Sequence, residues 1–557
     1  MSTSRNALSQ RTSISRPAAF SSPTIHPQAV AERLYELIEG PAADAQLLSV
    51  DGKQVTFGQM RQQAAAIARG LKASGLARGD TLALWLPNVA EWIAVTLACS
   101  RLGVAAVSLN PRWSDKEVGD LISRAACKAV VLAPHYRDGA ALKALRAVER
   151  SKLASLALVI VYGDAPVEPV LNDIAQIGLA ELAQTGGAEV EDGQPDDPIL
   201  ITATSGTTSL PKLVLHVQRS VCRHAADVAR VAGLLDDADT RMLLGVPFCG
   251  AYGYTIAVST LYAQRPLIVM DVFDPAAAGA LIREHAITHM LGTNDMLDKL
   301  LDAAPGARPF PSLRLFGHAN FVPSLNAMPP KAEAAGVLIR GFFGMSELLA
   351  GFAVQPADAP LARRAEAGGV PTCAQATFVI RDPDTGRDLA DGEVGELLAR
   401  TPNRMREYLN NPSANAAAFT DDGYFRTGDL AYRLPEGGFN FVSRMNDVLR
   451  IGGYLVSPIE IEEVIESDAA VDSCQVVAVL APQGVRPVAF VVARAGQVPD
   501  EATLLQHCRE KLAVYKVPIR IFPISEVPMV DSPNGPKVKR NALRDLALQL
   551  LGSGASN

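Results

Sequence analysis

The chain has 557 residues, enough for more than one domain with a sizeable core. Apolar residues make up 48% and charged residues 20%, a balance typical of globular proteins. The net charge of −7 gives no reason to expect nucleic acid or an anionic membrane as a partner. The seven cysteines lack the paired spacing of disulfide frameworks and zinc sites, which predicts reduced thiols in a cytoplasmic protein.

Neither a membrane span nor a structured N-terminus is expected. The most apolar window, Trp92 to Leu109, is interrupted by Arg101, so no transmembrane helix is predicted. Residues 1–28 carry arginines, many serines and no acidic residue, a composition that organellar transit peptides share. Because this segment has no clear apolar face, we expect a disordered tail, with a targeting signal as the alternative.

From Pro27 onward, patterns of helical and strand period alternate along the chain. The predicted helices are 31–38, 57–74, 91–102, 224–235, 275–285 and 295–301, and the predicted strands are 81–86, 105–109, 128–133, 156–162, 197–201, 212–216, 266–272 and 290–292. This alternation predicts α/β layers with largely parallel sheets. Residues 186–197, rich in glycine and acid, are expected to form a linker.

The last third of the chain changes character twice. Residues 366–441 contain short strands punctuated by glycine, and after Arg444 a compact unit of about 110 residues appears. Its predicted elements are a helix at 459–466, strands at 475–480 and 488–493, and a helix at 501–511. We therefore predict a tail at 1–28, a large domain at 29–442, a small domain at 443–550 and a second tail at 551–557.

The loop between strands 197–201 and 212–216 carries the strongest functional signal. It contains Thr204, Ser205, Gly206, Thr207, Thr208, Ser209 and Lys212. Such a loop leaves backbone N–H groups and hydroxyls free to surround an anion, and the lysine adds a positive charge. Its spacing differs from that of the P-loop of common NTPases. We interpret it as a polyphosphate site; a Ser/Thr-rich surface turn is the alternative.

Four further blocks follow in order. They are Phe343-Gly344-Met345-Ser346-Glu347, the Thr-Gly-Asp block within 425–430, the junction 443–454, and the basic block 534–544. Each alone could be a turn, a charged hairpin or a solvated tail. Together with the 204–212 loop, the five blocks resemble the adenylate-forming superfamily of acyl-CoA and aryl-CoA ligases, carrier-loading adenylation domains and luciferases. The resemblance spans residues 29–547.

The resemblance implies an α/β fold with two parts. The first is a large N-terminal domain of layered α/β subdomains plus a small β-barrel-like subdomain, and the second is a small mobile α+β C-terminal domain. The implied reaction has two steps: a carboxylate attacks the α-phosphate of Mg·ATP to give an acyl-adenylate and pyrophosphate, and a thiol then displaces AMP. ATP, Mg²⁺ and CoA as cosubstrate are therefore expected.

The resemblance also implies roles for individual residues. Lys537 would bridge the substrate carboxylate and the α-phosphate, Lys212 would act on the phosphates, and Glu347 with Thr208 would hold Mg²⁺. The nucleotide contacts it implies are residues 204–209, Phe343 stacking on adenine, Gly344, Ser346, Asp429 on the ribose, and Arg444. Asn446 falls at the hinge, and Gly452 and Gly453 would allow a pantetheine arm to approach. Ser209 and Leu213 replace glycines usual in the family, which would reduce loop mobility.

The acyl pocket is predicted from Gly250, Ala251, Tyr252 and Gly317. Gly250 stands where many members place an aromatic or histidine gate, which leaves space. Ala251 stands where amino-acid-activating members place an aspartate. Because a buried ammonium without a counter-charge is costly, α-amino acids are not expected as substrates. Ala251 also argues against 2-hydroxybenzoates, which leaves an apolar acid, aliphatic or plain aromatic.

Three functions follow, in order of preference. The first is a carboxylate–CoA ligase, the second is a stand-alone adenylation enzyme that loads a carrier protein in trans, and the third is a non-catalytic homologue that binds nucleotide or acyl ligand. The chain ends about twenty residues after Lys537, so a fused carrier is not expected. The presence of the implied catalytic and nucleotide-binding residues argues against the third. The particular acid and the oligomeric state stay open.

Overall fold

The computed structural model describes residues 31–163, 169–204, 211–319, 328–445, 449–451, 454–481, 484–530 and 537–553. The predicted tail 1–28, the five loop residues Ser205, Gly206, Thr207, Thr208 and Ser209, the hinge residue Asn446, and the pair Gly452 and Gly453 lie outside these ranges. For Lys537, the structure describes the backbone.

The first sheet has, within the described residues, eight strands in the order β19-β9-β8-β4-β3-β5-β6-β7. Their bounds are β3 (Thr81–Trp85), β4 (Ala105–Ser108), β5 (Ala129–Leu132), β6 (Leu158–Val161), β7 (Ala175–Gly178), β8 (Pro198–Ala203), β9 (Leu213–Val217) and β19 (Glu407–Tyr408). Strands β3 to β8 run parallel, whereas β9 is antiparallel to β8 and β19 to β9. Strands β4, β5 and β6 are buried along their whole length, as expected for a parallel sheet covered on both faces.

The second sheet has thirteen strands among the described residues, in the order β17-β18-β20-β21-β16-β15-β14-β13-β12-β10-β11-β1-β2. Their bounds are β1 (Gln46–Val50), β2 (Lys53–Thr56), β10 (Met242–Leu244), β11 (Leu267–Val269), β12 (His289–Thr293), β13 (Leu315–Ala319), β14 (Leu338–Met345), β15 (Leu349–Val354), β16 (Gly368–Pro371), β17 (Thr377–Arg381), β18 (Val394–Arg400), β20 (Phe425–Arg433) and β21 (Phe439–Arg444). The six strands β1, β11, β10, β12, β13 and β14 are parallel, and from β15 onward the pairing is antiparallel. This antiparallel part, predicted as a small β-rich subdomain, surrounds an aromatic core of its own that includes Phe352, Phe425 and Phe439.

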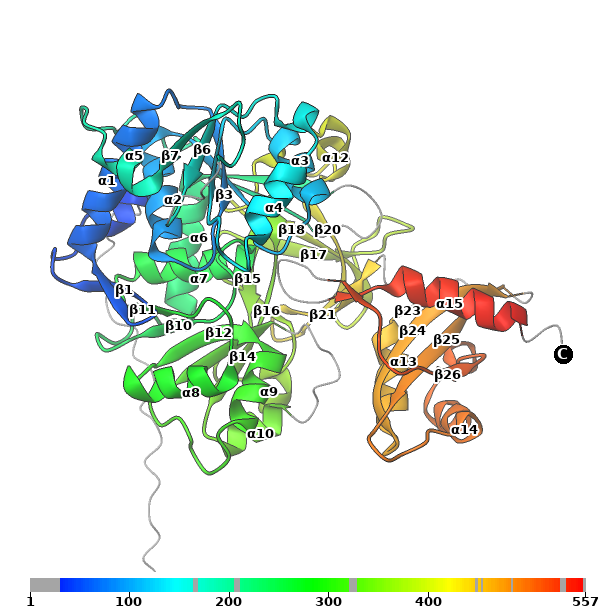
Figure 1. Ribbon diagram of the computed structural model, residues 1–557. Coiled ribbons are helices and arrows are strands. Elements are labelled where there is room, and N and C mark those ends of the chain that lie inside the picture. Colours follow the sequence, from blue (N-terminus) through cyan, green and yellow to red (C-terminus); the bar gives the residue numbers. More distant parts are fainter. Residues whose placement is uncertain are drawn as a thin grey trace, which may run out of the picture. The chain divides into compact units, whose positions relative to one another are not determined.

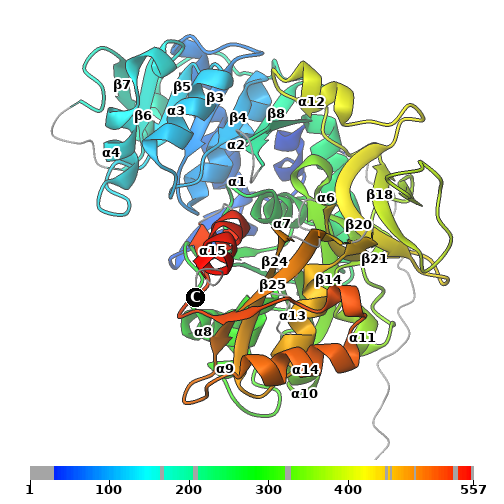
Figure 2. The ribbon, with the colours of Figure 1, turned by 90° about the vertical axis from the view of Figure 1, so that its right-hand side faces the viewer.

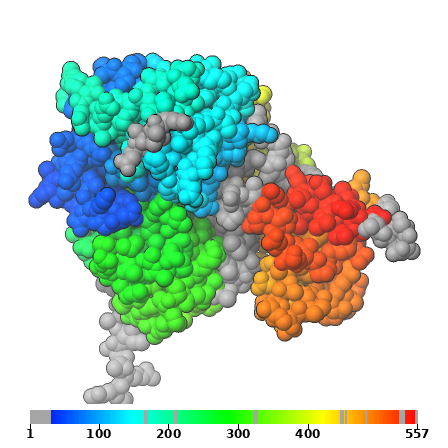
Figure 3. All heavy atoms as spheres, in the orientation of Figure 1, coloured from blue at the N-terminus to red at the C-terminus, as the bar shows by residue number. Residues whose placement is uncertain are grey.

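Helices form three layers around these sheets (Figure 1). Helices α1 (Phe57–Ala73), α2 (Ala90–Leu102), α6 (Gln218–Val231) and α7 (Ala251–Tyr262) lie between the sheets and share one core with residues of both. Helices α3 (Asp115–Arg124) and α4 (Ala140–Ala147) cover the other face of the first sheet. Helices α8 (Pro275–Glu284), α9 (Asn294–Asp302) and α10 (Met328–Ala334) cover the second and form the green surface in Figure 3. Shorter helices are α5 (Leu179–Gln184), α11 (Leu361–Arg364) and α12 (Pro412–Ala417).

The C-terminal part builds separate cores on a sheet of strands β24 (Val471–Ala481), β25 (Gly484–Ala493) and β26 (Ile521–Pro523). One face packs on α13 (Pro458–Glu466) and α14 (Glu501–Lys511), and the other on α15 (Arg540–Ser553) (Figure 2). The period of two is visible in β24: Val476 faces the first pair of helices and Val477 faces α15. Two small hairpins, β22 (Leu449–Ile451) with β23 (Tyr454–Val456) and β27 (Met529–Val530) with β28 (Lys537–Val538), complete it.

The predicted α/β architecture is confirmed, but two helix boundaries were wrong. Residues 31–38 form only a 3-10 helix at Leu34–Ile38, where Leu34 and Leu37 repeat at the three-residue spacing of that helix and are buried. The helix expected at 224–235 is α6, which instead spans Gln218–Val231. It begins without a side-chain cap and ends before Gly233, whose φ of +72° no longer fits a helix.

The structure also shows the surroundings of the cysteines and the apolar content of the helices. All seven cysteines are buried free thiols in the described residues. No described helix combines the length and apolar content needed to cross a membrane.

Candidate active site

The described ends of the predicted phosphate loop are tied to each other. The Thr204 backbone N–H donates to the Lys212 carbonyl at 2.9 Å, and the Lys212 N–H donates to Thr204 Oγ1 at 3.2 Å. These bonds extend the β8–β9 hairpin by one pair beyond Ala203 and Leu213. The loop therefore leaves and rejoins the sheet at one point, at the carboxyl end of β8, the edge where α/β sheets usually bind ligands.

Tyr408 joins two of the predicted catalytic residues. Strand β19 pairs Tyr408 with Val214 of β9, which brings the Tyr408 ring beneath Lys212, whose Nζ lies 4.6 Å from the ring centroid. The Tyr408 hydroxyl donates to Glu347 Oε1 at 2.8 Å. Burial, and then the charge of Glu347, raise the pKa of Tyr408 well above its usual range, so the hydroxyl stays a donor. Lys212 thus lies over the face of the Tyr408 ring, and Glu347 lies at its hydroxyl.

Glu347 sits in a turn whose backbone is held by hydrogen bonds from Met405 and His216. The residue is buried and its carbonyl accepts the Met405 N–H at 2.7 Å. The Ser346 carbonyl lies 2.7 Å from His216 Nε2. Burial lowers the pKa of His216 to about 4, so the imidazole is neutral at pH 7 and Nε2–H donates to this carbonyl. A buried carboxylate is a chemically suitable Mg²⁺ ligand, and Glu347, which Tyr408 links to Lys212 at the end of the predicted phosphate loop, fits that assignment.

Asp429 and Arg444 are brought together, as the two expected contacts of the nucleotide would be. They are direct partners across β20 and β21, with Arg444 Nε 3.5 Å from Asp429 Oδ1. The Asp429 side chain is 2% exposed and that of Arg444 is 52% exposed. The Asp429 N–H also donates to Thr427 Oγ1 at 3.1 Å, which fixes the Thr-Gly-Asp turn.

In the predicted block 343–347, the structure limits the stacking role of Phe343 and explains Gly344 by packing. Phe343 packs edge-on to Phe439 at 5.3 Å and is only 6% exposed, so an adenine could contact little of its ring. At Gly344 a Cβ would lie 2.5 Å from the Gly351 backbone nitrogen, so glycine is required there by the close approach of β14 and β15. Packing alone explains this glycine.

The predicted acyl residues do cluster. The Tyr252 hydroxyl, in the first turn of α7, donates to the Gly317 carbonyl of β13 at 3.2 Å. Gly250 and Ala251 are buried beside it. A Cβ on Gly317 would lie 2.6 Å from both Leu291 Cδ2 and Phe342 Cε2, so no larger residue fits without displacement. Ser108, at the carboxyl end of β4, donates to the Cys249 carbonyl at 3.1 Å and ties this segment to the first sheet.

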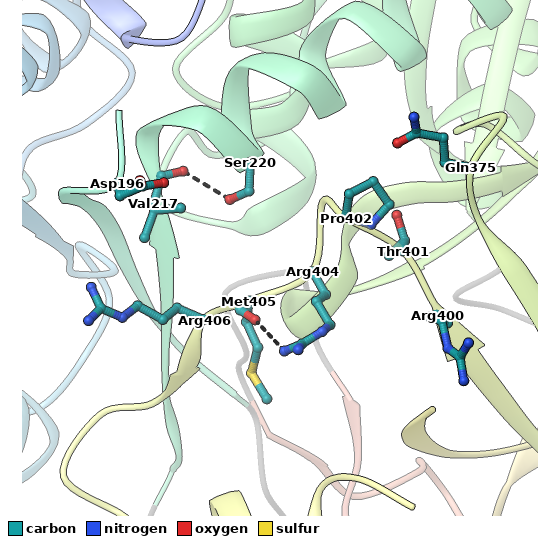
Figure 4. Close-up of a pocket in the computed structure, with 10 residues that line it drawn as sticks. All are labelled: Asp196, Val217, Ser220, Gln375, Arg400, Thr401, Pro402, Arg404, Met405 and Arg406. Atoms are coloured by element: carbon teal, nitrogen blue, oxygen red, sulfur yellow. Dashed lines mark hydrogen bonds between the residues drawn. The ribbon is translucent and has the colours of Figure 1, made fainter. Parts of the chain in front are cut away.

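A cleft of about 730 Å³ adjoins the Glu347 turn, because Met405, which donates to the Glu347 carbonyl, is one of its lining residues (Figure 4). It is lined by Asp196, Val217, Ser220, Gln375, Arg400, Thr401, Pro402, Arg404, Met405 and Arg406. None of these was predicted as a site residue, and Val217 ends β9 at the opposite end from Lys212. Arg404 and Arg400 are engaged with Phe419 and Tyr424. We therefore do not assign the cleft to the reaction.

Sequence reasoning missed three residues that build the site. Tyr408 was not predicted as a site residue, and its role depends on pairing with Val214, nearly two hundred residues away in sequence. Asn88 was missed entirely: its side chain donates to the carbonyls of Val246 and Met270 and accepts the Phe248 N–H at 2.8 Å, which fixes the acyl segment. His216 read as one residue of a strand. A buried polar residue in an apolar run was the available signal.

Comparison with known proteins agrees with this geometry. The AMP-binding enzyme family matches residues 38–409, and the C-terminal domain of AMP-binding enzymes matches residues 460–533. The chain belongs to the AMP-binding enzyme family, and the predicted adenylate-forming superfamily is thereby confirmed.

Individual relatives are similar over nearly the whole chain. A sulfoacetate–CoA ligase of Cupriavidus necator is 29% identical over 506 residues, covering 89% of this chain and 93% of the relative. The pyochelin synthase PchD of Pseudomonas aeruginosa is 29% identical over 480 residues, covering 85% and 84%. The crystal structure of ATP-bound MatB from Rhodopseudomonas palustris superposes with a TM-score of 0.79 at 24% identity, covering 92% and 98%, which confirms the fold.

Proposed function

We propose that the protein is an ATP-dependent carboxylate–CoA ligase that forms an acyl-adenylate and then an acyl-CoA thioester. The observation that carries the proposal is the Lys212–Tyr408–Glu347 arrangement at the closed base of the hydroxyl-rich loop. It offers a cation for the phosphates and a carboxylate for Mg²⁺ from fixed positions. The family and the sulfoacetate–CoA ligase relative support the same reaction.

In the first step, a substrate carboxylate oxygen attacks the α-phosphorus of Mg·ATP and pyrophosphate leaves. Mg²⁺ would offset charge on the phosphates, and Glu347 with Thr208 would hold it. Lys212 would bind the phosphates, while Lys537 would bridge the carboxylate and the α-phosphate as negative charge builds. Asp429 and Arg444 would hold the ribose.

In the second step, the sulfur of CoA attacks the carbonyl carbon of the acyl-adenylate, the carbon–oxygen bond to AMP breaks, and AMP leaves. We assign no general base to the thiol. Asn446 would be the hinge between the two steps, and Gly452 and Gly453 would line the path of the pantetheine arm.

We propose an apolar acid, aliphatic or plain aromatic, as the substrate. Residues 245–262, which include three of the four predicted acyl residues (Gly250, Ala251 and Tyr252), contain no charged side chain. Ala251 is 7% exposed and offers no counter-charge, and the Tyr252 hydroxyl is already engaged by Gly317. A charged acyl tail would therefore lose hydration without gaining a partner here.

A carrier protein is the second candidate acceptor. One observation favours it: the relative named pyochelin synthase has the same 29% identity as the sulfoacetate–CoA ligase, over 480 rather than 506 residues. The test is ATP–pyrophosphate exchange with a panel of carboxylic acids, followed by thioester formation with free CoA or with a carrier. Exchange followed by CoA turnover supports the ligase, and exchange without CoA turnover supports carrier loading. No exchange with any acid contradicts both and leaves a non-catalytic homologue.

A further inference from the structure

The turn that follows Glu347 contains a strained residue. Leu349 has φ +60° and ψ 159°, a region of backbone space that is essentially restricted to glycine, yet its side chain is buried at 1% exposure. Such a conformation persists only where the surrounding structure fixes it. Contacts from the surrounding structure must therefore fix the backbone of residues 346–350.

Two buried histidines anchor the backbone on either side of this residue. His216 Nε2 lies 2.7 Å from the Ser346 carbonyl, and His224 Nε2 lies 2.8 Å from the Ala350 carbonyl. A carbonyl can only accept, so each Nε2 carries the proton and donates. The rings are 0% and 2% exposed, and burial lowers the pKa of both, so both stay neutral.

The two histidines belong to the unit that carries Lys212. His216 lies in β9, which starts directly after Lys212, and His224 lies in α6, which follows β9. His216 Nδ1 has no hydrogen-bond partner in the described part of the chain, so the polar contact of this ring is the one with Ser346. One hairpin and helix thus fix the phosphate-binding lysine and, through two carbonyls, the Glu347 turn.

We propose that His216 and His224 are positioning residues that hold the strained 346–350 turn so that the Glu347 carboxylate is presented to the metal of Mg·ATP. The inference rests on the proposed function, because it requires Glu347 to be a magnesium ligand. Without the histidine donors the turn can relax at Leu349, and the carboxylate loses its fixed direction. The acyl segment at 246–252 is held instead by Asn88 and Ser108 and should be unaffected.

The experiment compares the Mg²⁺ dependence of ATP–pyrophosphate exchange in wild type, His216→Leu, His216→Gln, His224→Leu and a matched control, His289→Leu. His289 is also buried, but it lies in β12 and bonds Thr288 Oγ1 at 2.8 Å. We expect the Mg²⁺ concentration for half-maximal exchange to rise about tenfold in His216→Leu and His224→Leu, with the KM for the acid changed by less than about twofold. His216→Gln keeps a donor of similar reach and should remain within about threefold of wild type. His289→Leu should keep the wild-type Mg²⁺ dependence even if its melting temperature falls.

Failure of the positioning role and failure of the proposed function would give different results. Unchanged Mg²⁺ dependence in both leucine variants, or an equal shift in His289→Leu, would overturn the positioning role while leaving the proposed function intact. Mg²⁺-dependent ATP binding, measured by calorimetry on the wild type without any acid, tests the premise. If the wild type binds no Mg·ATP, the proposed function fails and the positioning role fails with it.

Discussion

At the scale of single residues, Tyr408 shows how one buried side chain can serve two charged groups. Its ring face lies under the Lys212 ammonium, and its hydroxyl donates to Glu347. These contacts use different parts of the side chain, so a substitution can remove one and keep the other. The hydroxyl directs the carboxylate, and the ring supports the lysine by a cation–π contact worth roughly 0.5–1 kcal/mol.

Tyr408→Phe should separate the two contacts. Loss of the hydroxyl leaves the buried Glu347 carboxylate without a donor at Oε1, which should cost about 1–3 kcal/mol, or about tenfold or more in the rate of ATP–pyrophosphate exchange at limiting Mg²⁺. Tyr136→Phe is the matched control for Mg²⁺ dependence, because its hydroxyl donates to a different carboxylate, that of Asp271, at 2.7 Å. Wild-type exchange in Tyr408→Phe would remove Tyr408 from the site.

His289 should make stability dependent on pH. Burial, and then the charge of Arg314, lower the pKa of His289 from 6.5 to about 4. As pH falls through 6.5 the unfolded chain takes up a proton that the folded chain refuses, so stability falls between pH 6.5 and 4, by about 3 kcal/mol in total. His289→Gln should make this limb of the urea-unfolding free energy against pH shallower but not flat, because the buried His216 and His224 contribute to it as well. An unchanged slope in His289→Gln would mean that the ring is already charged when folded.

At the scale of elements, local pattern explains most of the fold. Strands such as β5 and β8 were predictable because short apolar runs rich in branched residues have few alternatives to a buried strand. Helix α3 was missed despite Ser114 and Glu117, which form a capping box at its start. Helix α7 was missed because its residues are apolar on all sides and show no period.

The candidate site could be predicted only in part from the sequence, because the contacts that position its residues are not local. Lys212, Glu347, Asp429 and Arg444 lie in motifs with recognisable residue types, and the structure brings them together in two pairs. The contacts that position them come from distant elements: β19 against β9, and His216 against the 346–350 turn. Such pairings leave no local signal, because a single Tyr or His in an apolar run is compatible with ordinary core packing.

Helix α15 tests whether the C-terminal part is an energetically separate element. Leu543 is fully buried in the core that α15 shares with β24 and β25, whereas Leu548 on the same helix is 48% exposed. Leu543→Ala should destabilise the C-terminal part by about 2–5 kcal/mol, and Leu548→Ala by much less. Hydrogen exchange should show loss of protection in residues 454–553 with little change in the two large sheets. Uniform loss across the chain would show a single cooperative unit.

At the scale of the whole molecule, the buried residues fall into separate groups. Residues of both large sheets share one core from Leu34 to Val354, and the outer face of the first sheet and the antiparallel part of the second have further cores. The cores beyond Leu449 contain C-terminal residues alone. Separate cores permit unfolding in more than one step. They also suit a chemistry in which a residue of the C-terminal part, Lys537, acts in one half-reaction only.

The most direct test of the proposed two-step reaction is to measure both half-reactions in wild type, Lys537→Ala and the nearby control Lys539→Ala. ATP–pyrophosphate exchange reports adenylation, and acyl-CoA formation from supplied acyl-adenylate reports thioester formation. Lys537→Ala should abolish exchange and leave thioester formation largely intact, while Lys539→Ala should resemble wild type in both. Comparable losses of Lys537→Ala in the two half-reactions, or full exchange without the Lys537 ammonium, would contradict this prediction.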